Sequence, residues 1–64
     1  MGDISSIRLL TTEELAAEVK VSRRTLEGWR RIGKGPQPIR VGSQVRYRIE
    51  DVRKWLDQHL VDVA

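Results

Sequence analysis

The side chains with the clearest chemistry in this sequence are basic, and they are concentrated in its middle. Between Lys20 and Arg48 the chain carries nine lysines or arginines and one acidic residue, Glu27, a balance of +8. The other positions carry three basic and eight acidic residues, a balance of −5, so the 64-residue chain has a net charge of +3. A cationic surface between acidic ends is typical of proteins that bind polyanions, although a solvated basic surface that only confers solubility has the same composition.

Few residues are available for catalysis or metal binding. The sequence has no cysteine, and hence no disulfide, no thiol nucleophile and no cysteine-based zinc site. Its single histidine, His59, is not placed by any motif beside a nucleophile. Glu13, Glu14 and Glu18 are expected to face water on a first helix. We therefore expect no enzymatic activity, no cofactor and no metal.

The densest group of arginines belongs to a predicted helix that runs from Ser22 to Ile32. Ser22 is a favourable N-cap residue, and Gly33 is placed to end the helix in a left-handed conformation. Leu26, Trp29 and Ile32 recur at helical spacing, which predicts one face packed against a core. The opposite face is offered to a partner and carries Arg23, Arg24, Glu27, Gly28 and Arg31.

A second capped helix is predicted just before this one. Thr11 and Glu14 form a capping box, which predicts a helix over residues 12–19. Only Lys20 and Val21 separate this helix from the cap of the next, and two short helices joined so tightly form a helix-turn-helix.

The residues after Gly35-Pro36 alternate between apolar and basic with the period of a strand. Residues 39–41 and 45–49 predict a two-stranded hairpin around a three-residue connection, Gly42-Ser43-Gln44. An arginine-rich hairpin has the form of a wing, but arginines also protect an exposed sheet edge from pairing. We expect Ile39, Val41, Val45, Tyr47 and Ile49 to face the core and Arg40, Arg46 and Arg48 to face outward.

The sequence ends with a predicted helix that begins near Glu50 and Asp51. Val52, Trp55, Leu56 and Leu60 are expected to close the core over the first two helices and the hairpin. The expected fold class is mainly α with a small β-hairpin, a winged helix-turn-helix. We expect a flexible segment at residues 1–8, the domain at residues 9–60 and a frayed end at residues 61–64.

These motifs together resemble the small winged-helix proteins of the excisionase and MerR-like superfamily. The resemblance extends over residues 9–60 and is carried by residues 10–16, 21–26, 39–42, 45–48, 51–52 and 55–56. The sequence is most similar to the excisionases of phages and integrative elements, also called recombination directionality factors. A small AlpA-like transcriptional regulator has the same fold and remains an alternative, as does a module that binds an acidic protein.

The resemblance implies a helix in the major groove and a wing along the backbone or minor groove. It also implies double-stranded DNA as partner, with other copies of the chain on adjacent sites, DNA bending, and a tyrosine integrase directed towards excision. We expect a protein of the bacterial cytoplasm, associated with the nucleoid and without a membrane partner.

The candidate DNA contacts divide into two groups, because base edges specify a sequence and phosphates only position the protein. An acid such as Glu27 either accepts from a cytosine or orients a neighbouring arginine. The expected major-groove residues are Ser22, Arg23, Arg24, Thr25, Glu27 and Gly28. The expected backbone or wing residues are Arg30, Arg31, Lys34, Arg40, Gly42, Ser43, Gln44, Arg46 and Arg48.

Overall fold

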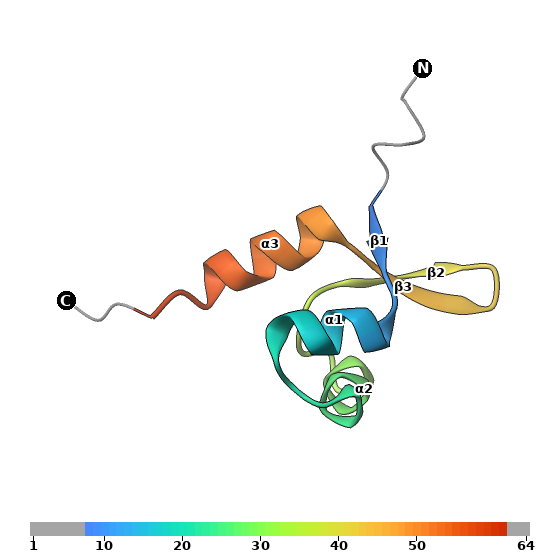
Figure 1. The fold of residues 1–64 in the computed structure, drawn as a ribbon, viewed down its shortest axis with the longest axis horizontal. Helices are drawn as coiled ribbons and strands as arrows, with labels where there is room; N and C mark the ends of the chain where they lie inside the picture. Colours follow the sequence, from blue (N-terminus) through green and yellow to red (C-terminus); the bar gives the residue numbers. More distant parts are fainter. Residues whose placement is uncertain (1–7, 62–64) are drawn as a thin grey trace, which may run out of the picture.

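The computed structural model of the chain describes residues 8–61, and its helices and hairpin follow one another in the predicted order (Figure 1). In chain order these are β1 (Leu9–Leu10), α1 (Thr12–Val19), α2 (Arg23–Arg31), β2 (Pro38–Val41), β3 (Gln44–Arg48) and α3 (Ile49–Gln58). Three helices and a hairpin wing confirm the winged helix-turn-helix fold. The flexibility expected for residues 1–7 and the fraying expected for residues 62–64 lie outside the described residues.

Local side-chain contacts define the ends of α1 and α2 as predicted. The Oγ1 atom of Thr11 accepts from the backbone N–H of Glu14 at 3.0 Å, and Glu14 Oε1 accepts from the N–H of Thr11 at 2.9 Å. Ser22 Oγ likewise accepts from the N–H of Thr25 at 3.0 Å. Gly33, with a φ of +78°, takes the left-handed conformation beyond the end of α2. Both helices of the motif therefore start and stop through contacts within a few residues.

A tight turn at Lys20 determines how α2 leaves α1. Lys20 has a φ of +61°, and its backbone N–H donates to the carbonyl of Ala16. The N–H of Val21 donates to the same carbonyl at 3.1 Å. The left-handed residue thus satisfies the end of α1 and turns the chain directly into α2.

A short strand that sequence analysis missed adds a third strand to the wing. Leu9 pairs with Arg48 and Leu10 with Tyr47, both antiparallel, so the sheet order is β1-β3-β2. Two residues are too few to show a strand period, so the sequence carried no signal for β1. Since β3 lies between two partners, the hairpin is anchored at its base against the segment that leads into α1.

The wing turns in two residues, where the sequence analysis expected three. Val41 pairs with Gln44, so Gln44 belongs to β3 and only Gly42 and Ser43 form the connection. Gly42 has a φ of +64°, as the first central position of a type II′ hairpin turn requires. The dipeptide Gly-Ser between two strands was the sequence signal for this turn.

This difference of one residue reverses the expected faces of β2. Ile39 lies opposite Arg46, and Arg40 lies opposite Val45. Opposite residues share a face of the sheet, and Val45 and Tyr47 pack on the core, so Arg40 is on the core-side face and Ile39 on the outer face. The expectation that the wing arginines share one face is therefore wrong, because a shift of register by one residue exchanges the two faces.

The core lies where α1, α2 and β3 meet. Leu15, Leu26 and Tyr47 are at most 2% exposed, and fully burying an apolar side chain contributes about 1.5–3 kcal/mol. Ile32 was expected to extend the buried face of α2, but it is 67% exposed. It caps the helix with a φ of −106°, so the helical spacing no longer holds at its position. The other core residues are Ala16 and Val52, with Leu10, Val19, Val21, Trp29 and Val45 packed around them.

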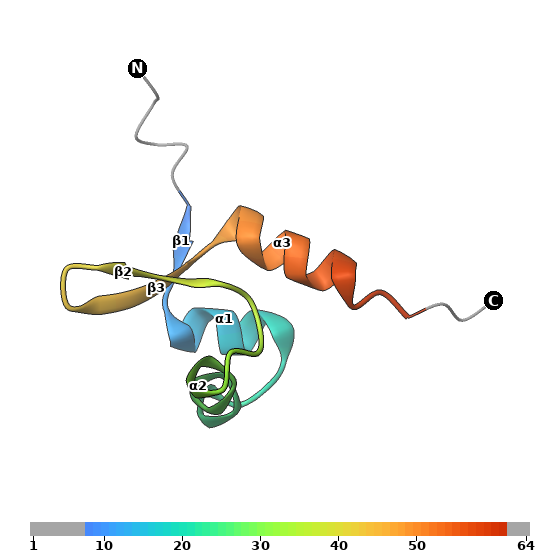
Figure 2. The ribbon, with the colours of Figure 1, turned by 180° about the vertical axis from the view of Figure 1, so that it is seen from behind.

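The last helix closes less of the core than predicted. Helix α3 includes Ile49, which was expected in the hairpin, and it contacts β3 while extending away from α1 and α2 (Figures 1 and 2). Val52 is buried and Trp55 partly buried, but Leu56 is 46% and Leu60 85% exposed. The prediction that Leu56 and Leu60 close the core is wrong, because Leu56 lies on an exposed side of α3 and Leu60 follows the end of the helix at Gln58.

Candidate nucleic-acid interface

Exposed cations without ionic partners flank the second helix and reach the wing. Their charged side-chain groups make no hydrogen bond and no ion pair with any of residues 8–61. Exposed arginine and lysine in this state can bind phosphate without breaking an internal contact. This group, which we call the exposed cations, comprises Arg24, Arg31, Lys34 and Arg40.

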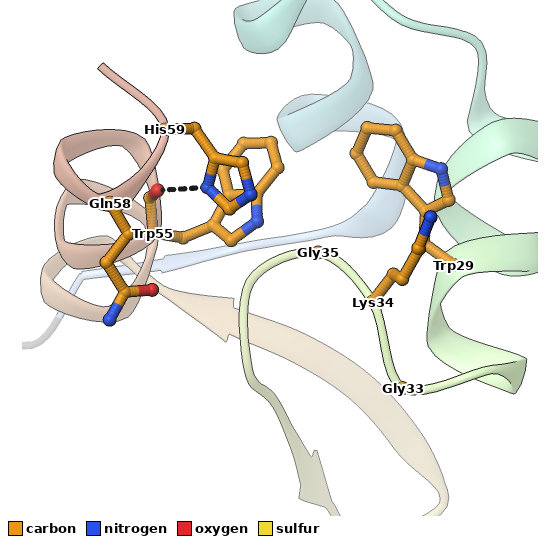
Figure 3. A pocket seen from close by; sticks show the side chains of 7 residues that line it. All are labelled: Trp29, Gly33, Lys34, Gly35, Trp55, Gln58 and His59. Atoms are coloured by element: carbon orange, nitrogen blue, oxygen red, sulfur yellow. Dashed lines mark hydrogen bonds between the residues drawn. The ribbon is translucent and has the colours of Figure 1, made fainter. Parts of the chain in front are cut away.

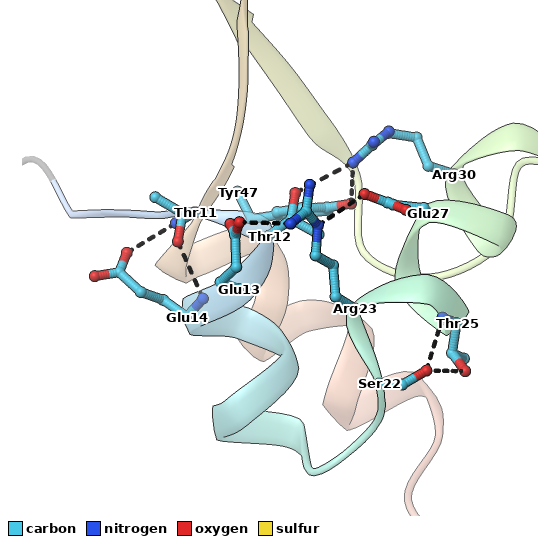
Figure 4. A network of polar contacts seen from close by, with 10 residues as sticks. All are labelled: Thr11, Thr12, Glu13, Glu14, Ser22, Arg23, Thr25, Glu27, Arg30 and Tyr47. Atoms are coloured by element: carbon cyan, nitrogen blue, oxygen red, sulfur yellow. Dashed lines mark hydrogen bonds and ion pairs between the residues drawn. The ribbon is translucent and has the colours of Figure 1, made fainter.

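The first arginine of α2 is held differently, by two carboxylates (Figure 4). Arg23 Nε donates to Glu27 Oε2 at 2.9 Å, and a terminal guanidinium nitrogen of Arg23 lies 3.0 Å from Glu13 Oε2. The hydrogen bond to Glu27 and the charge of Glu13 raise the pKa of Arg23 above its ordinary value. Of the two roles considered for Glu27, this structure displays the orientation of a neighbouring arginine.

Glu13 was not expected from the sequence to take part in the interface. Glu27 is one helical turn from Arg23 on α2, so a contact between those two could be anticipated from their spacing. Glu13 is on α1, and no local pattern links it to a residue on the next helix. Only the crossing of α1 and α2 brings its carboxylate to Arg23.

Arg30 was predicted to contact the DNA backbone, and its guanidinium turns inward (Figure 4). One terminal nitrogen donates to Thr12 Oγ1 at 3.3 Å and to the Tyr47 hydroxyl at 3.2 Å. Thr12 and Tyr47 are buried, so Arg30 ties α2 to both α1 and β3. Its phosphate contact stays a prediction, but the structure gives it an internal role that its position on the helix did not indicate.

The three wing arginines differ in their surroundings. Arg40 is exposed, whereas a terminal nitrogen of Arg46 donates to the carbonyl of Val45 at 2.8 Å. Arg48 Nε donates to Asp51 Oδ2 at 2.6 Å, and this hydrogen bond raises the pKa of Arg48. The tip is formed by residues 42–44, all of which are exposed. Arg40 and Arg46 therefore flank the tip, and Arg48 is engaged with α3 at the base of the wing.

Gly28 leaves open space on the surface of α2. A Cβ atom at this position would approach only the guanidinium of Arg31, at 3.9 Å, which is an ordinary contact. Nothing in the described part of the chain requires glycine here, and glycine in a helix interior costs about 1 kcal/mol relative to alanine. The absent side chain is consistent with close approach of another molecule to the helix.

An aromatic cleft lies away from the start of α2, between its end and α3 (Figure 3). The ring centres of Trp29 and Trp55 are 5.6 Å apart, and the His59 ring lies 4.9 Å from that of Trp55, tilted by 41°. Gly35 packs so closely that a Cβ would lie 3.0 Å from a ring carbon of Trp29. The cleft has a volume of about 490 Å³ and includes Lys34 at its edge.

The fold and the basic surface define a class of protein, a winged-helix DNA-binding domain. The family model described as a helix-turn-helix domain matches residues 9–60, which is most of the chain. The chain belongs to this helix-turn-helix domain family, whose members bind DNA. No curated protein and no solved structure was found to match it.

Over residues 8–61, none of the helices has the length and apolar character needed to span a bilayer. Within that same range, histidine, aspartate and glutamate side chains do not gather in threes as a metal ion would require.

Proposed function

We propose that this protein is an excisionase that acts by binding DNA and not by catalysis. It binds repeated sites cooperatively, bends the DNA and directs an integrase towards excision in the bacterial nucleoid. The observation that carries the proposal is the combination of a capped α1–α2 motif with an arginine-bearing wing, over the span that matches the family. The resemblance of the sequence motifs to excisionases supports the finer assignment.

The dimensions of α2 suit the major groove. An α-helix with its side chains is about 10–12 Å in diameter, and the major groove is roughly 12 Å wide and admits one helix. In helix-turn-helix proteins the first residues of the recognition helix contact base edges. We therefore assign base contacts to Arg23 and Thr25 and a flanking phosphate to Arg24, with Gly28 permitting the helix to approach closely.

The observed register gives the wing a cation on each face near its tip. Arg40 is on the core-side face and Arg46 on the outer face, and they lie near a turn of two small residues. A narrow tip with a basic side chain on either side suits a groove bordered by two rows of phosphates. This arrangement supports the assignment of Arg40 and Arg46 as backbone contacts.

The test is a gel-shift titration at physiological salt. The probes are circularly permuted fragments of the DNA that flanks the gene and of any linked attachment site. A ladder of cooperative complexes whose mobility depends on the position of the site supports an excisionase. A single unbent complex at a promoter indicates an AlpA-like regulator, and the absence of a specific shift indicates a module that binds an acidic protein.

A further inference from the structure

We propose that Glu13 and Glu27 position Arg23 to read a guanine in the major groove. Glu27 is already among the expected contacts, whereas Glu13 is a positioning residue that acts through Arg23. This inference rests on the proposed docking of α2, and it adds a determinant of sequence specificity that lies on α1.

The geometry fixes the guanidinium from two directions (Figure 4). Glu27 binds Nε at 2.9 Å from the same helix, and Glu13 binds a terminal nitrogen at 3.0 Å from the other helix of the motif. A guanidinium has five N–H donors, so the terminal nitrogens of Arg23 keep donors for a second partner. Bidentate pairing with O6 and N7 of guanine needs two such donors on one edge of the guanidinium.

The charge of this cluster favours a base over a phosphate. Arg23 with its two carboxylates carries a net charge of −1, whereas the other ionised side chains between Lys20 and Arg48 are all basic. A phosphate placed against Arg23 would lie near two negative charges, whereas the edge of a guanine carries no net charge. Arg24 and Arg31, which have no such partners among residues 8–61, remain available for phosphates.

Stability does not account for the cluster. All three side chains are substantially exposed, and exposed ion pairs add little to the free energy of folding. What the two contacts do is restrict the rotamers of a long side chain before DNA arrives. A restricted side chain loses less conformational freedom on binding, which favours the one base that fits its geometry.

The test compares Glu13→Gln with a matched control, Glu18→Gln. Both variants remove one negative charge from exposed positions on α1, but Glu18 makes no ion pair within residues 8–61. A site selected from random DNA by the wild-type protein is used with its single-base variants and with non-specific DNA. Thermal unfolding first establishes that both variants are folded.

For Glu13→Gln we expect unchanged or tighter binding to non-specific DNA, because an acid has been removed near phosphates. We also expect roughly fivefold or greater loss of discrimination at one G·C pair, the lower end of what a bidentate contact provides. Arg23→Lys should lose discrimination at the same pair, because an ammonium lacks the planar fork of donors that the two carboxylates orient. Glu18→Gln should retain the wild-type preference.

Three outcomes would overturn the inference, and they are distinguishable. If the wild-type protein selects a site and Glu13→Gln keeps full discrimination, the positioning role is wrong and the DNA-binding proposal stands. If the wild-type protein selects no sequence, both fail together. Loss of discrimination in Arg23→Lys at a pair that Glu13→Gln leaves unaffected would also show that Glu13 does not act through Arg23.

Discussion

At the scale of single residues, arginines with similar positions in the sequence have different surroundings. Arg23 is held by two carboxylates, Arg24 has no polar partner within residues 8–61, and Arg30 bonds to two buried hydroxyl groups. These surroundings suit Arg23 for reading a base, Arg24 for binding phosphate and Arg30 for stabilising the packing of the helices on the sheet. A count of basic residues therefore overstates how many of them are available to DNA.

Gly28→Ala should stabilise the protein and weaken DNA binding. Alanine gains about 1 kcal/mol of helix propensity, and its Cβ meets only the Arg31 side chain at 3.9 Å. If DNA approaches the helix at this point, the added methyl group lies between the two surfaces. Urea unfolding measures the first effect and fluorescence anisotropy with DNA the second; unchanged affinity in the stabilised variant would argue against close approach.

Arg46→Ala should weaken binding to all DNA sequences by a similar factor. Loss of one phosphate contact reduces the slope of log K against log salt by about one unit and leaves sequence preference unchanged. Arg53→Ala, on the exposed surface of α3, is the control and should leave the slope as it is. A changed base preference with an unchanged slope would assign Arg46 to base reading.

At the scale of elements, one residue of turn length decides what the wing presents. A three-residue connection would have put the apolar side chains of both strands on one face. The two-residue turn at Gly42 and Ser43 pairs Val41 with Gln44 and places Arg40 and Arg46 on opposite faces. The wing is therefore a hairpin with a cation on either side, and not a basic sheet surface.

Arg30→Ala should lower stability, in contrast to Arg31→Ala on the same helix. Removing the Arg30 guanidinium leaves the hydroxyls of Thr12 and Tyr47 without this partner between α1, α2 and β3. A buried polar group that loses its partner costs about 1–3 kcal/mol. Chemical denaturation of both variants measures the difference. Equal stabilities would mean that the Arg30 contacts add nothing to the packing of the motif.

At the scale of the whole molecule, the exposed cations and the wing give the protein one basic region with α3 extending away from it. The hairpin extends to one side of the helix pair and α3 to the other (Figures 1 and 2). A domain of this size has a modest footprint on DNA, about 600–1,000 Å² of protein surface. Useful specificity then favours several copies on adjacent sites.

The salt dependence of binding follows from the number of basic side chains that reach phosphate. The exposed cations together with Arg46 make five, and each phosphate contact contributes about −0.9 to the slope of log K against log salt. We expect a slope of about −4.5 for each protomer on double-stranded DNA. Measuring the binding constant between about 50 and 200 mM salt gives this slope. Over that range, every two phosphate contacts lower the affinity by roughly one order of magnitude. A slope near −1 would mean that most of these side chains do not contact DNA.

The sequence by itself determined the features that depend on neighbouring residues. The caps at Thr11 and Ser22 and the end of α2 at Gly33 were predicted, because their hydrogen bonds and backbone conformation involve only a few consecutive residues. The order of elements, and with it the winged helix-turn-helix class, followed from those boundaries. The Gly-Ser turn also encoded the register of the wing locally. We expected a three-residue connection, and this expectation predicted the wrong register.

Only the tertiary structure decided which separate elements meet. The pairing of Glu13 with Arg23, the inward turn of Arg30 and the added strand β1 join residues that no local pattern connects. The exposure of Leu56 has the same origin, because helical spacing shows which residues share a face but not where a neighbouring element ends. Contacts between elements depend on how those elements cross, and that crossing is a property of the packed core as a whole.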